Sequence, residues 1–303
     1  MVIKAWIRML RIPNLGILAF TQFLIYFKLI NFYFPGEELN LNLRQFSLLV
    51  IAFACVTCSG YIINNIYDRQ LDSRHELTSL IPKYFSLPFS WSLYSFFTFT
   101  GFAISCYLSF KTGFHYSILI YPFVAFGLWY YALKLKCSPL LGNILISIFT
   151  GLSIAIIPYA FWESIYALRL LDYVQWSQLM YHFIMLIILA FLSNLAREII
   201  KDIEDEEGDK AEACLSTAAY FGQQKCKQLA LHILVAIFVI NLSVCWFASN
   251  VQFVFYTIAF LVLPLTVIII QLIRSKVIKD FSRLSTMLKF YMLIGILFWT
   301  YIL

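Results

Sequence analysis

Two clusters of acidic side chains mark the parts of this sequence that could carry chemistry. The first contains an amide followed by two carboxylates, Asn64, Asp68 and Asp72, spaced four residues apart. A step of four residues on a helix turns about 40° past a full turn, so these side chains should share one face. The cluster directly follows an apolar run over 46–63, and ionisable groups at the end of a membrane helix are costly and usually functional.

The second cluster follows another long apolar run, over 179–195, and begins with Arg197. Its carboxylates at Asp205 and Asp209 are again four residues apart, and Asp202 lies one turn earlier. An acidic run at the end of a membrane helix can also be only a solvated cap. Two such runs with this spacing favour a shared site, so we expect the two clusters to form the halves of one site.

Carboxylates that face one another repel unless a cation lies between them. Mg²⁺ takes oxygen ligands and commonly binds through one or two carboxylates together with substrate phosphates. A diphosphate that bridges two metal-bound acidic faces is therefore the expected ligand. Arg197 and Lys201 would add positive charge, since arginine binds phosphate as a bidentate donor and lysine as a point charge. The candidate metal ligands are Asp68, Asp72, Asp202, Asp205 and Asp209.

Two weaker motifs lie between the clusters. Tyr130 and Lys134 are four residues apart and should share a face of the predicted helix. An aromatic residue with a lysine at a cytoplasmic helix end is also an ordinary interface anchor. Asn143 opens the next apolar run, where an amide can serve only to bond a neighbouring helix. By themselves these residues do not decide between a site and a structural role.

The elements that must position these residues are membrane helices. Of the 303 residues, 62% are hydrophobic and 13% are charged, whereas soluble domains carry about 25% charged residues. The chain is therefore predicted to be a polytopic membrane protein, and its net charge of +6 is not interpreted as nucleic-acid binding. Cys55 and Cys58 lie in an apolar run without a second pair, so these two are expected to be small core residues.

Nine apolar segments are long enough to cross a hydrocarbon core of about 30 Å, which takes about 20 helical residues. They cover residues 14–33, 46–66, 90–110, 115–133, 139–161, 175–199, 228–248, 251–273 and 286–302. The predicted fold class is all-α, with nine transmembrane helices of a single domain, residues 1–303, around a central cavity. Cytoplasmic cap loops are expected over 67–89 and 200–227. Each should begin with a helical continuation of the acidic run, and Gly208 is expected to interrupt the second.

The basic residues predict the orientation. The N-terminus and the loops after the second, fourth, sixth and eighth segments, counted together with the adjoining ends of the apolar segments, carry all but four of the 22 Lys and Arg residues. The exceptions are Lys28, Arg44, Lys111 and Arg169. By the positive-inside rule the basic side is cytoplasmic, and both acidic clusters lie on it. We therefore expect an integral protein of the bacterial inner membrane with a site that faces the cytoplasm.

Together these motifs resemble those of the UbiA superfamily of intramembrane prenyltransferases, and the resemblance extends over the whole chain. The family's Asn-x-x-x-Asp-x-x-x-Asp, Tyr-x-x-x-Lys and Asp-x-x-x-Asp motifs match Asn64/Asp68/Asp72, Tyr130/Lys134 and Asp205/Asp209. The stretch from Arg197 to Asp209, with Leu10-Arg-Ile-Pro-Asn14 near the start, is most similar to the branch named geranylgeranylglycerol-phosphate geranylgeranyltransferase.

The sequence departs from the family pattern at two places. Many members begin the first motif with Asn-Asp, whereas this chain has Asn64 followed by Asn65. Many also follow the motif with an Asn-x-x-x-Arg-Pro-like segment, of which only Pro82 remains. If the missing arginine normally binds diphosphate, either Lys83 or Arg74 must replace it or the activity is weakened or altered.

The resemblance implies a Mg²⁺-dependent transfer of a prenyl group from an allylic prenyl diphosphate to a lipophilic acceptor in the bilayer. That acceptor would be a glycerol-phosphate ether-lipid precursor or an aromatic or quinone precursor. Preorganised cations would stabilise the charge that develops on the leaving diphosphate. The residues implied as catalytic are Asp68, Asp72, Asp205, Asp209 and Lys134. Those implied as substrate-binding are Asn64, Tyr130, Lys201, Arg197, Asn143 and Arg74.

Two other functions stay open at the level of the sequence. A terpene cyclase of the same superfamily would use the same ionisation and quench the cation within the prenyl chain, and the altered segment after Asp72 allows this. A cation transporter would bind ions at intramembrane acids. Against a transporter, these acids lie at helix ends rather than at the midplane, where transporter sites lie.

Overall fold

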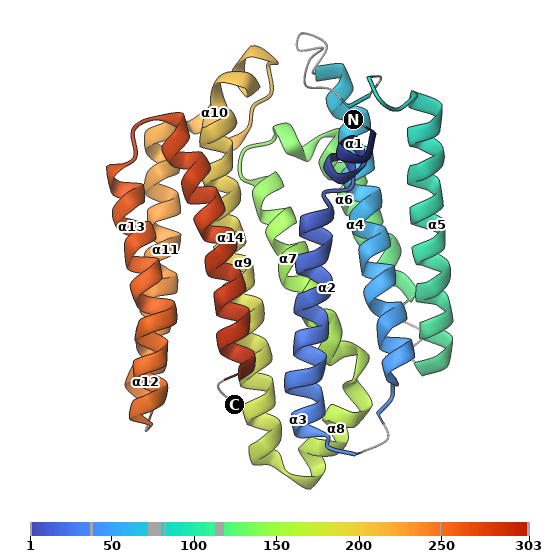
Figure 1. Ribbon diagram of the computed structural model, residues 1–303, viewed down its shortest axis with the longest axis vertical. Helices are drawn as coiled ribbons and strands as arrows, with labels where there is room; N and C mark the ends of the chain where they lie inside the picture. The colour runs from blue at the N-terminus through green and yellow to red at the C-terminus, as the bar shows by residue number, and fades with distance from the viewer. Residues whose placement is uncertain are drawn as a thin grey trace. The chain divides into compact units, whose positions relative to one another are not determined.

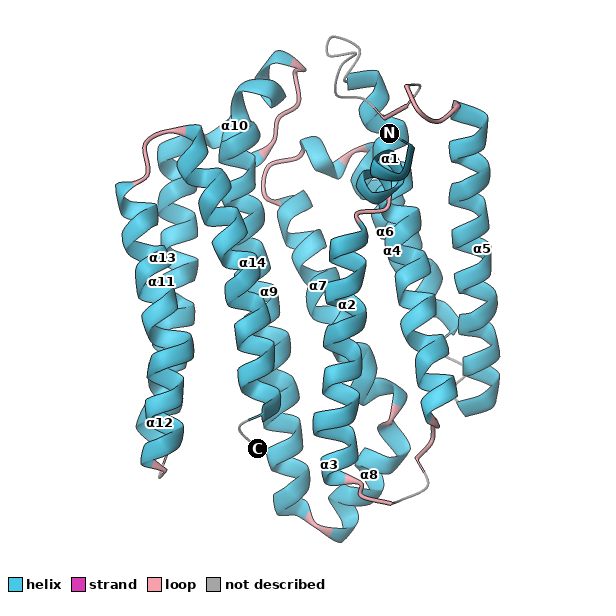
Figure 2. Cartoon of the chain, in the orientation of Figure 1, coloured by secondary structure: helices cyan, strands magenta, loops and turns pink. Residues whose placement is uncertain are grey.

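The computed structural model is helical throughout the part of the chain that it describes. Its described residues are 2–36, 39–71, 80–81, 83–112, 118–248 and 250–301. Within these ranges no strand occurs, which confirms the predicted all-α class (Figure 2). Asp72 and Arg74, two of the candidate site residues, lie outside the described residues.

The chain forms two compact units, residues 1–135 with 156–176 and residues 136–155 with 177–303. The helices of the first unit are α1 (Val2–Met9), α2 (Ile12–Ile25), α3 (Asn31–Tyr33), α4 (Leu43–Leu71), α5 (Leu87–Thr112), α6 (Ile120–Leu133) and α8 (Trp162–Leu171). Those of the second are α10 (Thr217–Phe221), α11 (Gln223–Phe247), α12 (Val251–Thr257), α13 (Leu263–Arg274) and α14 (Ile278–Tyr301). Two helices contribute to both units, α7 (Leu141–Ala160) and α9 (Tyr173–Ala211).

Eight continuous helical stretches in the described residues are long and apolar enough to cross a membrane. Their bounds are Ile12–Tyr33, Leu43–Arg69, Leu87–Lys111, Leu141–Ala160, Tyr173–Ala211, Gln223–Trp246, Val251–Arg274 and Ile278–Tyr301. In Figure 1 they correspond to α2 with α3, α4, α5, α7, α9, α11, α12 with α13, and α14. Each coincides with a segment predicted from hydropathy, so the chain is an integral membrane protein.

The predicted fourth span, 115–133, is represented by α6. This helix is apolar, but its 14 residues reach about 21 Å, which is less than the thickness of a hydrocarbon core. Residues 113–117 lie outside the described part of the chain. The count of nine spans therefore stays a prediction.

α8 is a helix that hydropathy did not predict, because its ten residues are too few to form a span. It is tied to the segment before α4 within the first unit. The side-chain oxygen Oδ1 of Asn40 accepts a hydrogen bond from the backbone N of Ser164 at 3.0 Å. The amide of Asn40 also donates to the Glu163 carboxylate. Oδ1 of Asn40 also accepts from the Ser164 hydroxyl, so three hydrogen bonds of one asparagine side chain hold the start of α8.

The end of α4 that carries the first acidic cluster has one apolar face. Ile62, Ile63 and Ile66 are buried there in a cluster shared with residues of α1 and α6. Asn64 and Asp68 are half-buried on the remaining surface of the helix. Burial of the isoleucines fixes the rotation of α4, and this rotation determines where the polar side chains project.

The second unit is organised around one apolar face of α9. Ile199, Ile200 and Ile203 are buried in a core shared with α11, α13 and α14, the helices drawn beside α9 in Figure 1. With 39 residues, α9 reaches about 58 Å, about twice the thickness of the hydrocarbon core. Its charged C-terminal part therefore extends beyond the apolar span.

The expectation that Gly208 interrupts the acidic run is wrong. α9 continues through this position to Ala211. A glycine inside a helix costs only about 1 kcal/mol relative to alanine, and the long packed helix before it supplies far more stability than that.

α7 runs antiparallel to α9 within the second unit. The amide of Asn194 on α9 donates to the Ser147 hydroxyl on α7 at 3.3 Å. One turn further along α7, a Cβ atom at Gly151 would lie 3.5 Å from Ile187, which precedes Asn194 on α9. Small residues at such contacts let two membrane helices approach closely. The approach brings the start of α7 to the acid-bearing end of α9.

The close packing of α5 on α6 gives a test of the first unit. A Cβ atom at Gly101 would come within 2.2 Å of the Tyr121 hydroxyl. Tyr121 is buried and donates to the Phe97 carbonyl at 3.2 Å, so it cannot withdraw without losing that bond. We expect Gly101→Ala to lower the free energy of unfolding by about 1–3 kcal/mol, measured by thermal unfolding of the detergent-solubilised protein. The control is Gly16→Ala, since nothing lies within 4 Å of a Cβ there; equal melting temperatures of the two variants would contradict this packing.

Candidate active site

The first acidic cluster presents an amide and a carboxylate that contact each other. Asn64 donates from Nδ2 to Oδ2 of Asp68 at 2.7 Å, four residues further along α4. Asn64 Oδ1 is buried and has no hydrogen-bond partner among the described residues. A buried oxygen that lacks a donor is costly in a folded protein unless a bound group satisfies it. The pair therefore offers oxygen atoms to a ligand.

Asn65, the residue that departs from the family pattern, does not join this pair. Its side chain donates back to the Tyr61 carbonyl at 2.6 Å, within the same helix. A carboxylate at this position could not donate such a bond. The asparagine thus has a local structural partner.

The N-terminal segment brings further polar groups to α4, one turn before Asn64. The Arg11 guanidinium lies 4.9 Å from the centre of the Tyr61 ring, and the Asn14 amide donates to the Tyr61 hydroxyl at 3.4 Å. Arg11 also has a left-handed backbone conformation (φ 47°), which is uncommon for a residue with a side chain. The sequence analysis did not include Arg11 among the site residues, although the stretch from Leu10 to Asn14 supported the family resemblance.

Tyr130 and Lys134 lie at the end of α6. Lys134 is the C-cap of the helix and donates from its backbone N to the Tyr130 carbonyl at 2.9 Å. Its side chain is exposed. The Tyr130 ring stacks on Phe126, with 6.1 Å between ring centres. The helix ends at this lysine, so the ammonium group is carried at a helix terminus where the backbone carbonyls also favour positive charge.

The cations of the second cluster pair with acids of their own helix. Lys201 Nζ lies 3.7 Å from Oδ2 of Asp205, and the two side chains are 38% and 51% exposed. Exposed pairs of this kind contribute little stability. Arg197 forms an ion pair with the neighbouring Glu198, and both side chains are largely buried. Lys201 and Asp205 are thus free to exchange partners, whereas Arg197 is held.

Asp202 makes hydrogen bonds to two other elements. Its Oδ2 accepts from Nδ2 of Asn143 at 3.0 Å and from the backbone N of Thr217 at 3.2 Å. The Thr217 hydroxyl donates to Oδ1 of Asn143 at 2.5 Å and accepts from the backbone N of Leu140 at 3.0 Å. These bonds close a ring that joins α7, α9 and the start of α10.

Two members of this ring, Asn143 and Asp202, are residues for which a role in binding substrate or metal was predicted. Asn143, predicted to bind substrate, uses both ends of its amide on Asp202 and Thr217. Asp202, predicted to hold metal, has one carboxylate oxygen in the ring. The contacts observed for both are positioning contacts, and their roles toward substrate and metal stay predictions.

The acid-bearing end of α9 is closed by the chain that follows it. Cys214 donates from its backbone N to the Asp209 carbonyl at 2.9 Å, and Ala213 donates to the Lys210 carbonyl at 3.2 Å. Ala213 is left-handed, with φ 55°. These two bonds and this conformation form a Schellman motif, a common C-terminal helix cap whose left-handed position is usually glycine.

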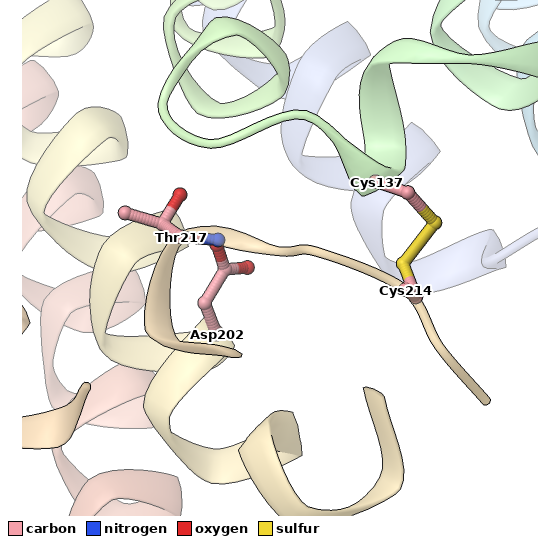
Figure 3. Close-up of a disulfide and its surroundings, with 4 residues drawn as sticks. All are labelled: Cys137, Asp202, Cys214 and Thr217. Atoms are coloured by element: carbon pink, nitrogen blue, oxygen red, sulfur yellow. A yellow bond between two sulfur atoms is a disulfide. The ribbon is translucent and has the colours of Figure 1, made fainter. Parts of the chain in front are cut away.

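A disulfide holds the same turn. Cys214 is bonded to Cys137, which ends the helical turn Leu135–Cys137 after α6, and the two Cα atoms are 4.8 Å apart (Figure 3). The sequence analysis did not predict this bond. The two cysteines are separated by 77 positions in the sequence, and neither has a partner at a spacing typical of metal or redox motifs.

Several predicted site residues therefore lie together within each unit. Asn64 contacts Asp68 in the first, and in the second Asn143 contacts Asp202, and Lys201 contacts Asp205. Among the residues that the structure describes, no group of three or more His, Cys, Asp or Glu side chains could hold a metal ion by itself. Mg²⁺ at these carboxylates would need further oxygen ligands. The meeting of the two clusters across one cavity stays a prediction.

Comparison with known proteins places these motifs in a family context. The sequence model of the UbiA prenyltransferase family matches residues 29–298. The chain is 26% identical to digeranylgeranylglyceryl phosphate synthase of Saccharolobus solfataricus over 98% of this chain and 96% of that protein. It is 28% identical to the protein of the same name from Methanobrevibacter smithii over 82% and 83% of the two chains.

Solved structures share the fold. One of them, a structure of a digeranylgeranylglyceryl phosphate synthase, has a TM-score of 0.67 at 21% identity and covers 99% of this chain and 97% of its own. A UbiA homologue from Archaeoglobus fulgidus bound to DMAPP and Mg²⁺ has a TM-score of 0.56 at 18% identity, with 96% and 98% covered.

The hydrogen-bonded ring predicts that Thr217 stabilises the second unit through its hydroxyl. Thr217 is fully buried, so Thr217→Val would keep the shape and leave the Leu140 amide and the Asn143 carbonyl without their partner. We expect the free energy of unfolding to fall by about 1–3 kcal/mol. The matched control is Thr286→Val, because this exposed hydroxyl bonds only the carbonyl one turn earlier in its own helix. A loss of similar size in both variants, measured by thermal unfolding, would argue against the ring.

Proposed function

Because the chain belongs to the UbiA prenyltransferase family, we propose that it transfers a prenyl group from an allylic prenyl diphosphate to a membrane-bound acceptor that carries a glycerol phosphate. Mg²⁺ is the proposed cofactor. The substrates are a prenyl diphosphate donor and a lipophilic acceptor in the bilayer.

The named relatives support each part of this proposal. The name digeranylgeranylglyceryl phosphate synthase describes a product with two geranylgeranyl groups on a glyceryl phosphate, so those enzymes use a glycerol-phosphate acceptor. The Archaeoglobus fulgidus homologue has been solved with DMAPP and Mg²⁺ and with GPP and Mg²⁺. Prenyl diphosphate and Mg²⁺ are thus compatible with the fold that this chain shares.

The observation that carries the proposal is the chemistry of the two acid-bearing helix ends, both of which lie inside the family match. At each end, one face of the helix is buried in an apolar core and the other carries carboxylate or amide oxygens. Hard oxygen donors suit Mg²⁺, whereas thiolates and imidazoles would favour other metals. The buried Oδ1 of Asn64, without a partner among the described residues, adds a further oxygen to this set.

The side chains divide into two roles in this proposal. Asp68, Asp205 and Asp209 are the proposed metal ligands, and Asp72 is proposed as a fourth from its spacing alone. When bound, Mg²⁺ supplies positive charge that neutralises the diphosphate. The proposed phosphate contacts are Lys134, Lys201, Arg197, Arg74 and Tyr130. Arg11, over the Tyr61 ring, adds a guanidinium one turn before Asn64 on α4.

Lys201 is the cation best placed to respond to substrate. Its 3.7 Å contact with Asp205 is exposed and weak. A diphosphate offers more oxygen atoms and more charge than one carboxylate, so the ammonium group can transfer to it. The donor's C–O bond then breaks with its electron pair leaving on the diphosphate. The acceptor hydroxyl bonds to C1 of the prenyl chain and releases its proton.

The membrane orientation is part of the same proposal. The excess of Lys and Arg on the side of the acidic clusters supports a site that faces the cytoplasm. The bacterial inner membrane stays a prediction, and the relatives named above are archaeal. A single functional domain over 1–303, capped by residues 67–89 and 200–227, is likewise proposed.

The proposal is tested by the purified protein in liposomes with radiolabelled geranylgeranyl diphosphate, a geranylgeranylglyceryl phosphate acceptor and Mg²⁺. We expect a prenylated acceptor that requires Mg²⁺. Asp205→Asn should reduce kcat/KM by at least about 100-fold, since substitutions that only perturb the surroundings of a metal ligand cost 10–100-fold. Thin-layer chromatography and mass spectrometry of the product measure this.

The matched control is Glu207→Gln, which removes an exposed acid of the same run that is not among the proposed ligands. It should retain near-full activity. Hydrocarbon products that form without any acceptor would contradict prenyl transfer and indicate a terpene cyclase. Metal flux in liposomes without diphosphate would contradict prenyl transfer and indicate a cation transporter. Equal losses of activity in Asp205→Asn and Glu207→Gln would contradict the assigned role of Asp205.

A further inference from the structure

The segment between α9 and α10, residues 212–216, is held at three points, and we call it the strap. At its start, the backbone N of Cys214 caps the Asp209 carbonyl at 2.9 Å. In its middle, Cys214 is covalently bonded to Cys137. At its end, Thr217 bonds Asp202 and Asn143. Figure 3 shows the disulfide and the Asp202–Thr217 contact on the same stretch of chain.

Within the strap, Cys214 and Ser216 are buried whereas Ala213 and Leu215 are exposed, and part of the strap is strained. Cys214 is 2% exposed and Thr217 is fully buried. Ala213 has the left-handed conformation that residues with a Cβ atom adopt at a cost. Such a conformation persists only where the surrounding contacts over-determine it. The disulfide one residue later is the strongest of these contacts.

The strap and Thr217, the residue after it, reach two of the three candidate aspartates at the end of α9. They contact the backbone of Asp209 through Cys214 and the side chain of Asp202 through Thr217. Neither Cys214 nor Thr217 needs to touch a substrate for these contacts to act. Thr217 is therefore a positioning residue for the Asp202 carboxylate, and Cys214 is a positioning residue for the backbone at Asp209.

The side of the membrane on which the disulfide lies determines the redox conditions to which it is exposed. The acid-bearing side of the chain is the side predicted to be cytoplasmic. Disulfides on that side are rare, and in mesophiles they are mostly transient, catalytic or redox-sensing; hyperthermophiles are the exception. The other five cysteines are unpaired, so the bond is specific to Cys137 and Cys214.

We propose that the Cys137–Cys214 disulfide sets the affinity of this site for the Mg²⁺–diphosphate donor, and that its reduction by a dithiol weakens donor binding by loosening the cap that the strap forms on the Asp209 carbonyl. This inference rests on the proposed prenyl transfer. The dithiol attacks the half-buried Cys137 sulfur, and Cys214 leaves as the thiolate. Two electrons and two protons pass to the cysteines, and the dithiol becomes a cyclic disulfide.

Reduction should loosen the strap without unfolding the unit. The bonds of Thr217 to Asp202 and Asn143 do not depend on the disulfide, so the end of the strap stays attached. The strained turn at Ala213 loses its covalent support, and with it the cap on Asp209. We therefore expect KM for the donor to rise about tenfold, with kcat changed less than twofold.

The experiment uses the full-length protein in liposomes, incubated with either oxidised glutathione or dithiothreitol. Donor KM and kcat are measured with geranylgeranyl diphosphate, and hydrogen exchange is measured by mass spectrometry on peptides that cover residues 205–217. Cys137→Ser should show the KM of the reduced protein under both conditions. Cys106→Ser, which removes an unpaired half-buried thiol, should respond to dithiothreitol as the parent protein does.

Two variants of Thr217, one that keeps the hydroxyl and one that removes it, test whether this residue positions the site or only packs in the core. Thr217→Ser keeps the hydroxyl and should retain the donor KM of the parent protein. Thr217→Val keeps the shape and should raise KM. Equal KM values in the two variants would show that Thr217 contributes only packing and would overturn its assigned role.

The exchange measurement decides the inference independently of activity. We expect peptides over 205–217 to exchange at least fivefold faster after reduction, as the Cys214 amide loses its bond to Asp209. Unchanged exchange would overturn the inference, as would thiol labelling that finds both cysteines free after oxidation or a donor KM that does not respond to dithiothreitol. Faster exchange in a protein with no transfer activity would instead retain the strap and reject prenyl transfer.

Discussion

The hydrogen bonds of Asp202 are the constraint on which the polar end of the second unit depends. The half-buried Asp202 directly precedes Ile203, which is buried in the core of α9, α11, α13 and α14. A charged group in that position is costly unless hydrogen bonds satisfy it. Asn143 and Thr217 supply them from α7 and from the start of α10. The hydrogen bonds of one side chain therefore join three elements near the end of α9, where Asp205 and Glu207 are exposed.

In the first unit, the hydrogen bond to the carboxylate comes from an amide of the same helix. Isoleucines on one side of α4 enter an apolar cluster with α1 and α6, and Asn64 satisfies one oxygen of Asp68 on the other side. In both units an amide donates to a carboxylate at the end of a long apolar helix. The amide can come from the same helix or from a neighbouring one, because the strength of the hydrogen bond depends on the donor and its geometry and not on the helix that carries it.

The disulfide lies on the side of the chain that the basic residues predict to be cytoplasmic. The distribution of Lys and Arg predicts that the acid-bearing side is cytoplasmic, whereas a stable disulfide is typical of oxidising compartments. A bond whose state varies with conditions reconciles the two. Its connection to the helix cap at Asp209 gives that variation a physical route to the carboxylates.

Local rules explain how much the sequence determined by itself. A hydrocarbon core requires long apolar helices, so hydropathy identified the membrane segments and the all-α class. Helical periodicity likewise fixed which acids share a face, because four residues return nearly to the same side. The family match over 29–298 confirmed the resemblance drawn from those spacings.

Other features depended on contacts between residues far apart in the sequence, and only the tertiary structure decided them. Thr217 finds Asn143 across 74 positions, and Cys137 finds Cys214 across 77. No local pattern marks either pair. Hydropathy did not predict α8, because a ten-residue helix is too short to cross a membrane. Gly208 is helical because the packing of α9 outweighs the low helix propensity of one glycine. Spacing along one helix is set by backbone geometry, whereas partners across helices are set by which faces are buried together.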